Sequence, residues 1–237
     1  GELRREGASV ASGGCVLLLF LFTRKHQPAQ RADARSPYPS CLGRHPFSDD
    51  KHGALFGDPV RGRFQVFLTE DGGESWKPVA ESALPPALEN EGAFAASGSC
   101  LVRGPEGRIA FVTGGAAQSR VFSSTDGGRS FRVSVSPVPT GAPSRGLFSA
   151  HWLDASRLIV VGGDYRDRAL AGINAGASTD AGSSWTGFTA APAGFLSSVV
   201  RGPSREGAST IVAVGLAGTG LSRDGGKTWT ALDDAPY

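Results

Sequence analysis

The stretch Ser222–Trp229, which reads Ser-Arg-Asp-Gly-Gly-Lys-Thr-Trp, decides the fold because the chain carries its pattern four times. The other three copies occupy residues 69–76, 124–131 and 178–185, and all four fit Ser/Thr-x-Asp-x-Gly-x-Ser/Thr-aromatic. We call each copy an Asp box. A single copy is a common turn sequence, whereas four copies in register indicate repeated structural units.

Each Asp box predicts a hairpin turn between two β-strands. Glycine takes the positive φ that such turns need, and the Asp carboxylate can accept hydrogen bonds from N–H groups of its own turn. The aromatic residue begins the returning strand as an apolar anchor. We therefore expect structural roles, not catalytic ones, for the Asp and the aromatic residue of each box: Asp71, Trp76, Asp126, Phe131, Asp180, Trp185, Asp224 and Trp229.

The spacing of the boxes predicts an all-β chain built as a β-propeller of four-stranded blades. The four Asp residues are 55, 54 and 44 residues apart, and repeats of this length with several short strands are typical of propeller blades. Unbroken apolar runs occupy the second strand of three repeats, at 109–112, 158–161 and 211–214. We expect these runs to be covered on both faces by neighbouring blades.

Residues 47–237 are expected to form about four blades of a larger ring, because propellers with blades of this length more often close with about six to eight. The second repeat predicts strands at 94–102, 108–113, 120–124 and 130–135. The first repeat predicts only three clear strands, with its innermost strand degraded or displaced towards Phe47.

Residues 1–46 form a separate segment by composition, for which we expect little packed structure. An apolar run, Cys15–Phe22, precedes a basic, proline-rich tract at 23–46. Two interpretations stay open: a signal-like segment, or misassigned sequence upstream of a true repeat. Since the chain contains no methionine, we also expect it to be processed or a fragment.

Composition argues against several function classes. The 24 basic and 22 acidic residues nearly balance, so no overall field favours nucleic acid, and the apolar run at 15–22 is too short for a stable membrane span. The three cysteines and four histidines show no metal-ligand spacing; three cysteines allow a disulfide, but their pattern does not indicate one. No GxGxxG motif opens a helix, so no cofactor and no metal is predicted.

The boxes resemble the bacterial neuraminidase repeat of sialidases, sortilin-type receptors and xyloglucan-cleaving propellers. Three further stretches, at 57–64, 94–98 and 161–165, resemble bacterial photosystem II stability/assembly factor-like propellers, which are often labelled oxidoreductases. The resemblance covers residues 47–237. It implies a non-catalytic assembly or binding module with a protein or glycan partner, in the periplasm or secreted. It implies no oligomeric state.

Candidate ligand-binding residues are expected on the loops between the second and third strands and on the links between blades. These segments lie opposite the Asp boxes, and binding sites favour loops held by a rigid scaffold. Arginines beside carboxylates can bind an anionic ligand through two parallel hydrogen bonds. The same residues also form ordinary surface ion pairs. The predicted set is Asp58, Arg61, Arg63, Arg120, Arg145, Asp164, Tyr165 and Arg166.

A glycoside hydrolase is the alternative function. A sialidase needs a tyrosine nucleophile, and Tyr165 is the one tyrosine in a predicted blade loop; the Arg-Ile-Pro motif of those enzymes is absent. A two-carboxylate glycosidase needs a facing pair of acids, for which Asp58 and Asp164 are the candidates. The sequence does not show that they converge, so no catalytic residue is assigned.

Overall fold

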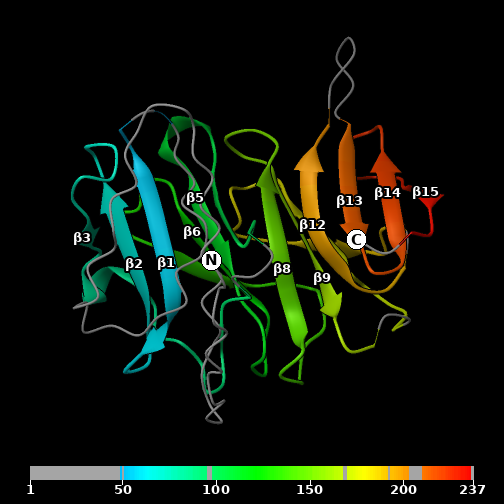
Figure 1. Cartoon of the computed structure of the whole chain (residues 1–237), viewed down its shortest axis with the longest axis horizontal. Coiled ribbons are helices and arrows are strands. Elements are labelled where there is room, and N and C mark those ends of the chain that lie inside the picture. Colours follow the sequence, from blue (N-terminus) through cyan, green and yellow to red (C-terminus); the bar gives the residue numbers. More distant parts are fainter. Residues whose placement is uncertain are drawn as a thin grey trace, which may run out of the picture. The chain divides into compact units, whose positions relative to one another are not determined.

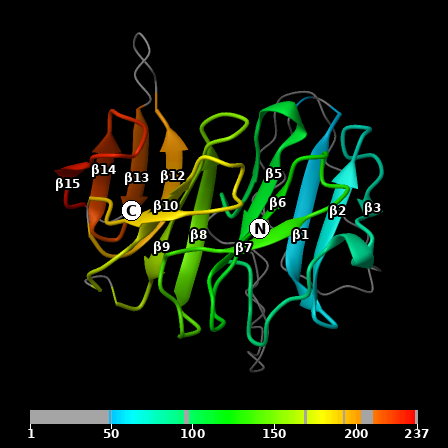
Figure 2. The same ribbon diagram turned by 180° about the vertical axis from the view of Figure 1, so that it is seen from behind.

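The computed structural model describes residues 49, 51–94, 98–167, 170–191, 193–202 and 210–235. Residues 1–48, which include the predicted N-terminal segment, lie outside this range. The described chain forms four antiparallel sheets that follow one another in chain order (Figures 1 and 2). The predicted all-β fold of propeller blades is confirmed.

The first two sheets account for residues up to 135. The first sheet has three strands, β1 (Gly53–Val60), β2 (Arg63–Thr69) and β3 (Lys77–Pro78). The second has four, β4 (Leu101–Arg103), β5 (Ile109–Val112), β6 (Arg120–Ser124) and β7 (Arg132–Val135). Short 3₁₀ turns occur at Glu81–Ala83 and Pro105–Gly107.

The third and fourth sheets repeat the four-stranded order. The third contains β8 (Arg145–Trp152), β9 (Leu158–Asp164), β10 (Ala175–Ser178) and β11 (Thr186–Phe188). The fourth contains β12 (Leu196–Arg201), β13 (Ile211–Gly215), β14 (Gly218–Ser222) and β15 (Thr230–Asp233). In every sheet each strand pairs with the next one along the chain, so each is a simple meander.

One predicted strand is wrong at its start. Of the described residues in the expected strand at 94–102, only Leu101 and Val102 lie in a strand, β4, and Gly98 has a φ of 70°, which an extended chain does not adopt. The first sheet has three strands among the described residues, as the sequence predicts. The box at 69–76 directly follows β2, and this position makes β2 the third strand of its repeat.

Burial shows which sheets are covered on both faces. Every residue of β5 is buried, as are all residues of β9 except one. In contrast, β13 alternates between buried and half-buried positions, so Val212 and Val214 retain exposure. The expectation of two-sided cover therefore holds for the second and third sheets, and fails for the fourth, which is covered on one face by the third.

The Asp boxes also connect neighbouring sheets. The indole Nε1 of Trp185, in the box of the third sheet, donates to Ser134 Oγ on β7 of the second sheet at 2.9 Å. Trp229 in the fourth sheet stacks on Phe188 in the third, with ring centroids 6.3 Å apart. The aromatic residue of these two boxes thus anchors its sheet to the preceding one, in addition to starting its own returning strand.

Candidate functional site

The described sheets have two structurally distinct ends. At one end, the box of the second sheet contacts the turn between the first two strands of that sheet, where Gly127 N donates to Gly107 O at 3.1 Å. The third sheet repeats this contact between Ala181 N and Ser156 O at 2.7 Å. We call this end the box face. The other end, which carries the loops between second and third strands and the links between sheets, is the loop face.

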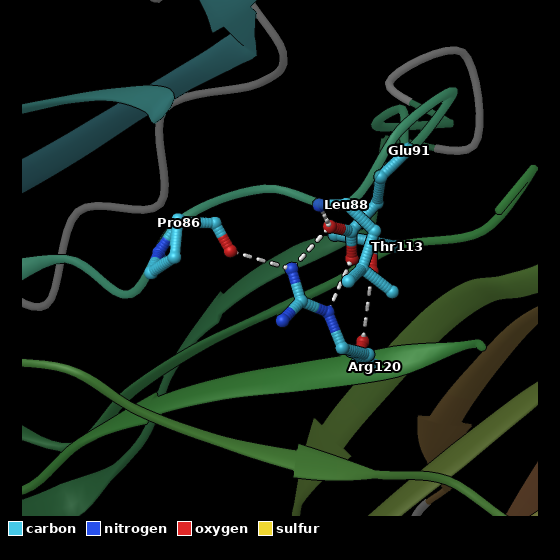
Figure 3. Close-up of polar contacts among 5 residues, drawn as sticks. All are labelled: Pro86, Leu88, Glu91, Thr113 and Arg120. Atoms are coloured by element: carbon cyan, nitrogen blue, oxygen red, sulfur yellow. Dashed lines mark hydrogen bonds and ion pairs between the residues drawn. The ribbon is translucent and has the colours of Figure 1, made fainter. Parts of the chain in front are cut away.

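A buried ion pair fixes the link between the first two sheets on the loop face (Figure 3). Arg120, the first residue of β6, donates from Nε to Glu91 Oε1 at 2.9 Å and from Nη2 to Glu91 Oε2. The two side chains are 8% and 0% exposed. Nη2 also donates to the carbonyl of Pro86 at 2.9 Å, so one guanidinium holds two points of the link.

The carboxylate of Glu91 has further donors besides Arg120. Leu88 N donates to its Oε2 at 2.8 Å, and the hydroxyl of Thr113 donates to its Oε1 at 2.5 Å (Figure 3). The guanidinium carbon of Arg120 lies 4.9 Å from the centroid of the Phe122 ring. Because burying an unpaired charge is very costly, this set of partners is what allows both charges to lie inside the protein.

Sequence reasoning missed Glu91, which belongs to no motif. A signal was present nonetheless. The residue four positions before the Ser or Thr that opens each box is Gln65, Arg120, Asn174 and Gly218 in the four repeats, so an arginine stands at a position that is otherwise neutral. An arginine on an otherwise buried strand requires a carboxylate or carbonyl partner, and the adjoining link was the place to look.

The predicted residues of the first sheet also contact the link. Asp58 Oδ1 accepts a hydrogen bond from Ala93 N at 2.9 Å, and Arg63 Nη1 donates to the carbonyl of Leu84. Arg61 is exposed in the turn between β1 and β2, where it has a φ of 52°. Asp58 and Arg63 therefore hold the link in place, while Arg61 faces solvent.

The predicted residues of the third sheet come together. Arg145 and Asp164 face each other across β8 and β9, and Arg145 Nε donates to Asp164 Oδ2 at 2.7 Å. The side chain of Asp164 is 6% exposed and that of Arg145 is 31% exposed, so the arginine of the pair retains contact with solvent. Burial acts to raise the pKa of Asp164, but the bonds from Arg145 and Ser144 outweigh it and lower that pKa to about 2.

Tyr165 stands on a cluster of phenylalanine rings. The rings of Phe94 and Phe148 stack with centroids 4.1 Å apart, and Tyr165 meets both edge-on at 6.3 and 6.0 Å. Phe195 packs against Phe148 at 4.7 Å. The guanidinium of Arg166 lies 5.9 Å from the Tyr165 centroid. The side chain of Tyr165 is nevertheless 40% exposed, so a rigid apolar base presents an accessible ring.

The predicted site residues thus divide into groups. Arg145, Asp164, Tyr165 and Arg166 gather on the third sheet, whereas Arg120 is buried against Glu91 and the first-sheet residues are bound to the link. The two candidate acids, Asp58 and Asp164, bond to different partners. Sequence reasoning missed the supporting rings of Phe94, Phe148 and Phe195, which come from separate repeats and were read only as strand residues.

The box face carries an open hollow of about 310 Å³. We call it the box-side hollow. Its residues come from the first two sheets and from the segment before β1, and include charged groups of both signs. They are Asp49, His52, Leu68, Glu70, Arg103, Gly107, Asp126, Gly127 and Arg129. The sequence had directed attention to the opposite end of the sheets.

The described residues contain neither a metal-binding group nor a membrane-spanning helix. No group of three or more His, Cys, Asp or Glu side chains in these ranges is arranged to hold a metal ion. No helix in the same part of the chain has the length and apolar character to cross a membrane.

Comparisons with known proteins support the fold. The sequence matches no protein-family model and no curated protein. Among solved structures, the chain is similar to YCF48 bound to D1 peptide, with 18% identity and a TM-score of 0.51 over 81% of this chain and 53% of that one. It is also similar to the GH74 enzyme of Niastella koreensis, with 18% identity and a TM-score of 0.55 over 78% of this chain and 29% of that one.

The chain spans about half the length of the YCF48 structure and less than a third of the GH74 structure. At this identity the similarity shows a shared fold and not a shared function. One of the two structures holds a bound peptide, and the other is an enzyme. The described chain is therefore a set of β-propeller blades similar in fold to these two structures.

Proposed function

We propose that this protein is a non-catalytic binding module that presents its loop face to a segment of a protein partner. The observation that carries the proposal is Tyr165, whose 40% exposed ring rests on the stacked Phe94 and Phe148. Tyrosine and arginine are enriched among the residues that dominate binding energy, and a rigid anchor loses little entropy on binding. The guanidinium of Arg166 lies over this ring, and Asp164, which forms the ion pair with Arg145, directly precedes Tyr165 in the sequence.

The similar YCF48 structure supports a protein partner, since that propeller is described with a D1 peptide bound. The polar groups of the loop face also favour binding over hydrolysis. Asp164 is paired with Arg145 at 2.7 Å, and this pairing helps to lower the pKa of Asp164 to about 2, so its carboxyl group is ionised at neutral pH and is not a proton donor for general acid catalysis.

The proposal is tested by selecting short random peptides that bind the full chain and measuring their affinity for two variants. Tyr165→Ala removes the anchor and is expected to weaken binding about tenfold or more. Leu232→Ala removes an equally apolar side chain that is 56% exposed on β15, and is expected to change affinity less than about twofold. Equal effects of the two variants would contradict the proposal.

The hydrolase alternative has its own test. Sialosides and plant and bacterial glycans are offered to the protein, and released sugar is measured. We expect no turnover. Turnover that disappears in Tyr165→Phe, which keeps the ring and removes only the hydroxyl, would replace the binding function by a catalytic one.

A further inference from the structure

The fourth sheet carries an apolar face that the first three sheets bury. In every sheet, one residue of the second strand of the repeat pairs with the Ser or Thr that opens the box, and the residues one and three positions later are apolar and share a face. We call this the forward face. In the first three sheets these residues are 0% exposed, whereas in the fourth they are half-buried. In chain order they are Ala54, Phe56, Ala110, Val112, Ile159, Val161, Val212 and Val214.

The next sheet along the chain covers each of the first three forward faces. Phe56 of the first sheet packs against Phe111 of the second, with ring centroids 4.9 Å apart, and β5 of the second sheet contacts β8 of the third. Ile159 and Val161 of the third sheet form one buried cluster with Ala213 of the fourth. The fourth sheet ends the row of described sheets (Figures 1 and 2), so no described sheet covers its forward face.

The uncovered forward face presents a continuous apolar patch. Val200, Val212 and Leu221 lie side by side across β12, β13 and β14, because Val200 pairs with Val212 and Val212 pairs with Leu221. Val214 lies two residues further along β13 and pairs with Thr219, which is uncharged. Val200 is 46% exposed. We call the four apolar residues the fourth-sheet patch. A sheet face in water normally carries polar side chains, so this patch indicates an interface.

The two ends of the fourth sheet differ in charge. Arg223 and Lys227 are exposed on the hairpin between β14 and β15, on the box face, where Asp224 offsets one of the two positive charges. Asp233 and Asp234 are exposed at the opposite end, where β15 finishes. The described residues thus give this sheet a positive end, a negative end and an uncharged middle.

We infer that the fourth-sheet patch is a dimer interface, at which two copies of this chain pack forward face against forward face. Two-fold symmetry allows the strands of the two copies to run either parallel or antiparallel across the interface. The parallel arrangement would bring the two positive ends together. The antiparallel arrangement places Arg223 and Lys227 of each copy near Asp233 and Asp234 of the other, so charge complementarity favours it. The interface is separate from Tyr165, and the inference does not rest on the proposed function.

Sedimentation of the full chain over a wide range of protein concentration measures the association. We expect a dimer that dissociates on dilution and no larger species, since a two-fold interface closes on itself. Val200→Asp puts a charge into the patch of both copies and is expected to weaken the dimer about tenfold or more. The matched control, Val135→Asp, changes a valine that is 52% exposed on β7 and should alter the dissociation constant less than about twofold. Because both valines are exposed, neither variant should change the thermal unfolding midpoint.

Charge reversal tests the antiparallel arrangement. Arg223→Glu or Asp234→Arg alone brings like charges together twice in each dimer, and each is expected to weaken association about fivefold at low salt. An equal mixture of the two variants should associate nearly as well as wild type, because in the mixed dimer the two introduced charges have opposite signs and meet each other. The inference is overturned if the chain stays monomeric at every concentration or forms species larger than a dimer. It is also overturned if Val200→Asp and Val135→Asp act equally, or if the mixture associates no better than its components.

Discussion

Arg120 and Glu91 form an ion pair in which both side chains are buried, and this pair ties the third strand of the second sheet to the link that precedes the sheet. The pair explains why an arginine that the sequence suggested for ligand binding faces inward. It also holds the segment leading to Phe94, on which Tyr165 rests. The loop face is therefore held in place by a buried ion pair as well as by packing.

Glu91→Gln should destabilise the protein by about 3–5 kcal/mol, because it leaves the buried guanidinium of Arg120 without its counter-charge. Chemical denaturation measures the change in free energy of unfolding. Glu106→Gln is the matched control. Glu106 is 71% exposed and 3.9 Å from Arg108, so its loss should cost less than about 1 kcal/mol. Similar costs for both variants would show that the buried pair is not the main constraint on the link.

Ser124→Ala should destabilise the second sheet by about 1–2 kcal/mol. The buried hydroxyl of Ser124 accepts from Gly128 N at 2.8 Å and donates to Asp126 Oδ1, and alanine would leave that N–H without a partner. Thermal unfolding gives the difference. Thr125→Ala, one residue further in the same box, should be nearly neutral, and a larger loss for Thr125→Ala than for Ser124→Ala would contradict the role given to the box hydroxyl.

Gly114→Ala should destabilise the loop face, because a Cβ at this position would come within 2.5 Å of the Phe94 ring and 2.7 Å of Gly146 Cα. Overpacking of this kind costs about 1–3 kcal/mol. Gly92, which pairs with Gly114 in an isolated bridge, is the control, since its nearest neighbour would be Asp58 Oδ1 at 3.7 Å. Gly92→Ala should unfold close to the wild-type temperature; an equal loss would remove the steric explanation.

Stability should fall as the pH is lowered from about 4 to about 2. Burial acts to raise the pKa of Asp126, but its bonds from Ser130 and Ser124 lower it to about 2, below its ordinary value of 3.8. As the pH falls, Asp126 therefore binds a proton in the unfolded state before it does so in the folded state. The stabilisation from Asp126 is complete above its ordinary pKa and is lost as the pH falls through its folded-state pKa. The difference in unfolding free energy between wild type and Asp126→Asn should shrink over this interval; a constant difference would contradict the assignment. Because Asp126 is exposed, solvent screening keeps the effect small.

Local signals predicted the fold well and the loop face only in part. The boxes predicted the last hairpin of every sheet, and β6 occupies the predicted range 120–124, because turn chemistry and apolar runs act over a few residues. The start of β4 was misplaced, since the positive φ of Gly98 cannot be read from a single glycine. The Arg120–Glu91 pair joins residues 29 apart, and the ring cluster joins three repeats, so neither leaves a local pattern.

Hydrogen exchange in the presence of a selected peptide ligand tests the central claim that the loop face is the binding face. Binding should slow amide exchange in the loops at 113–120 and 164–167, and leave the boxes at 124–131 and 178–185 unchanged. The comparison is internal, because both sets of segments are measured in the same sample. Protection of the boxes with no change in the loops would contradict the account and place the protein-binding function on the box face.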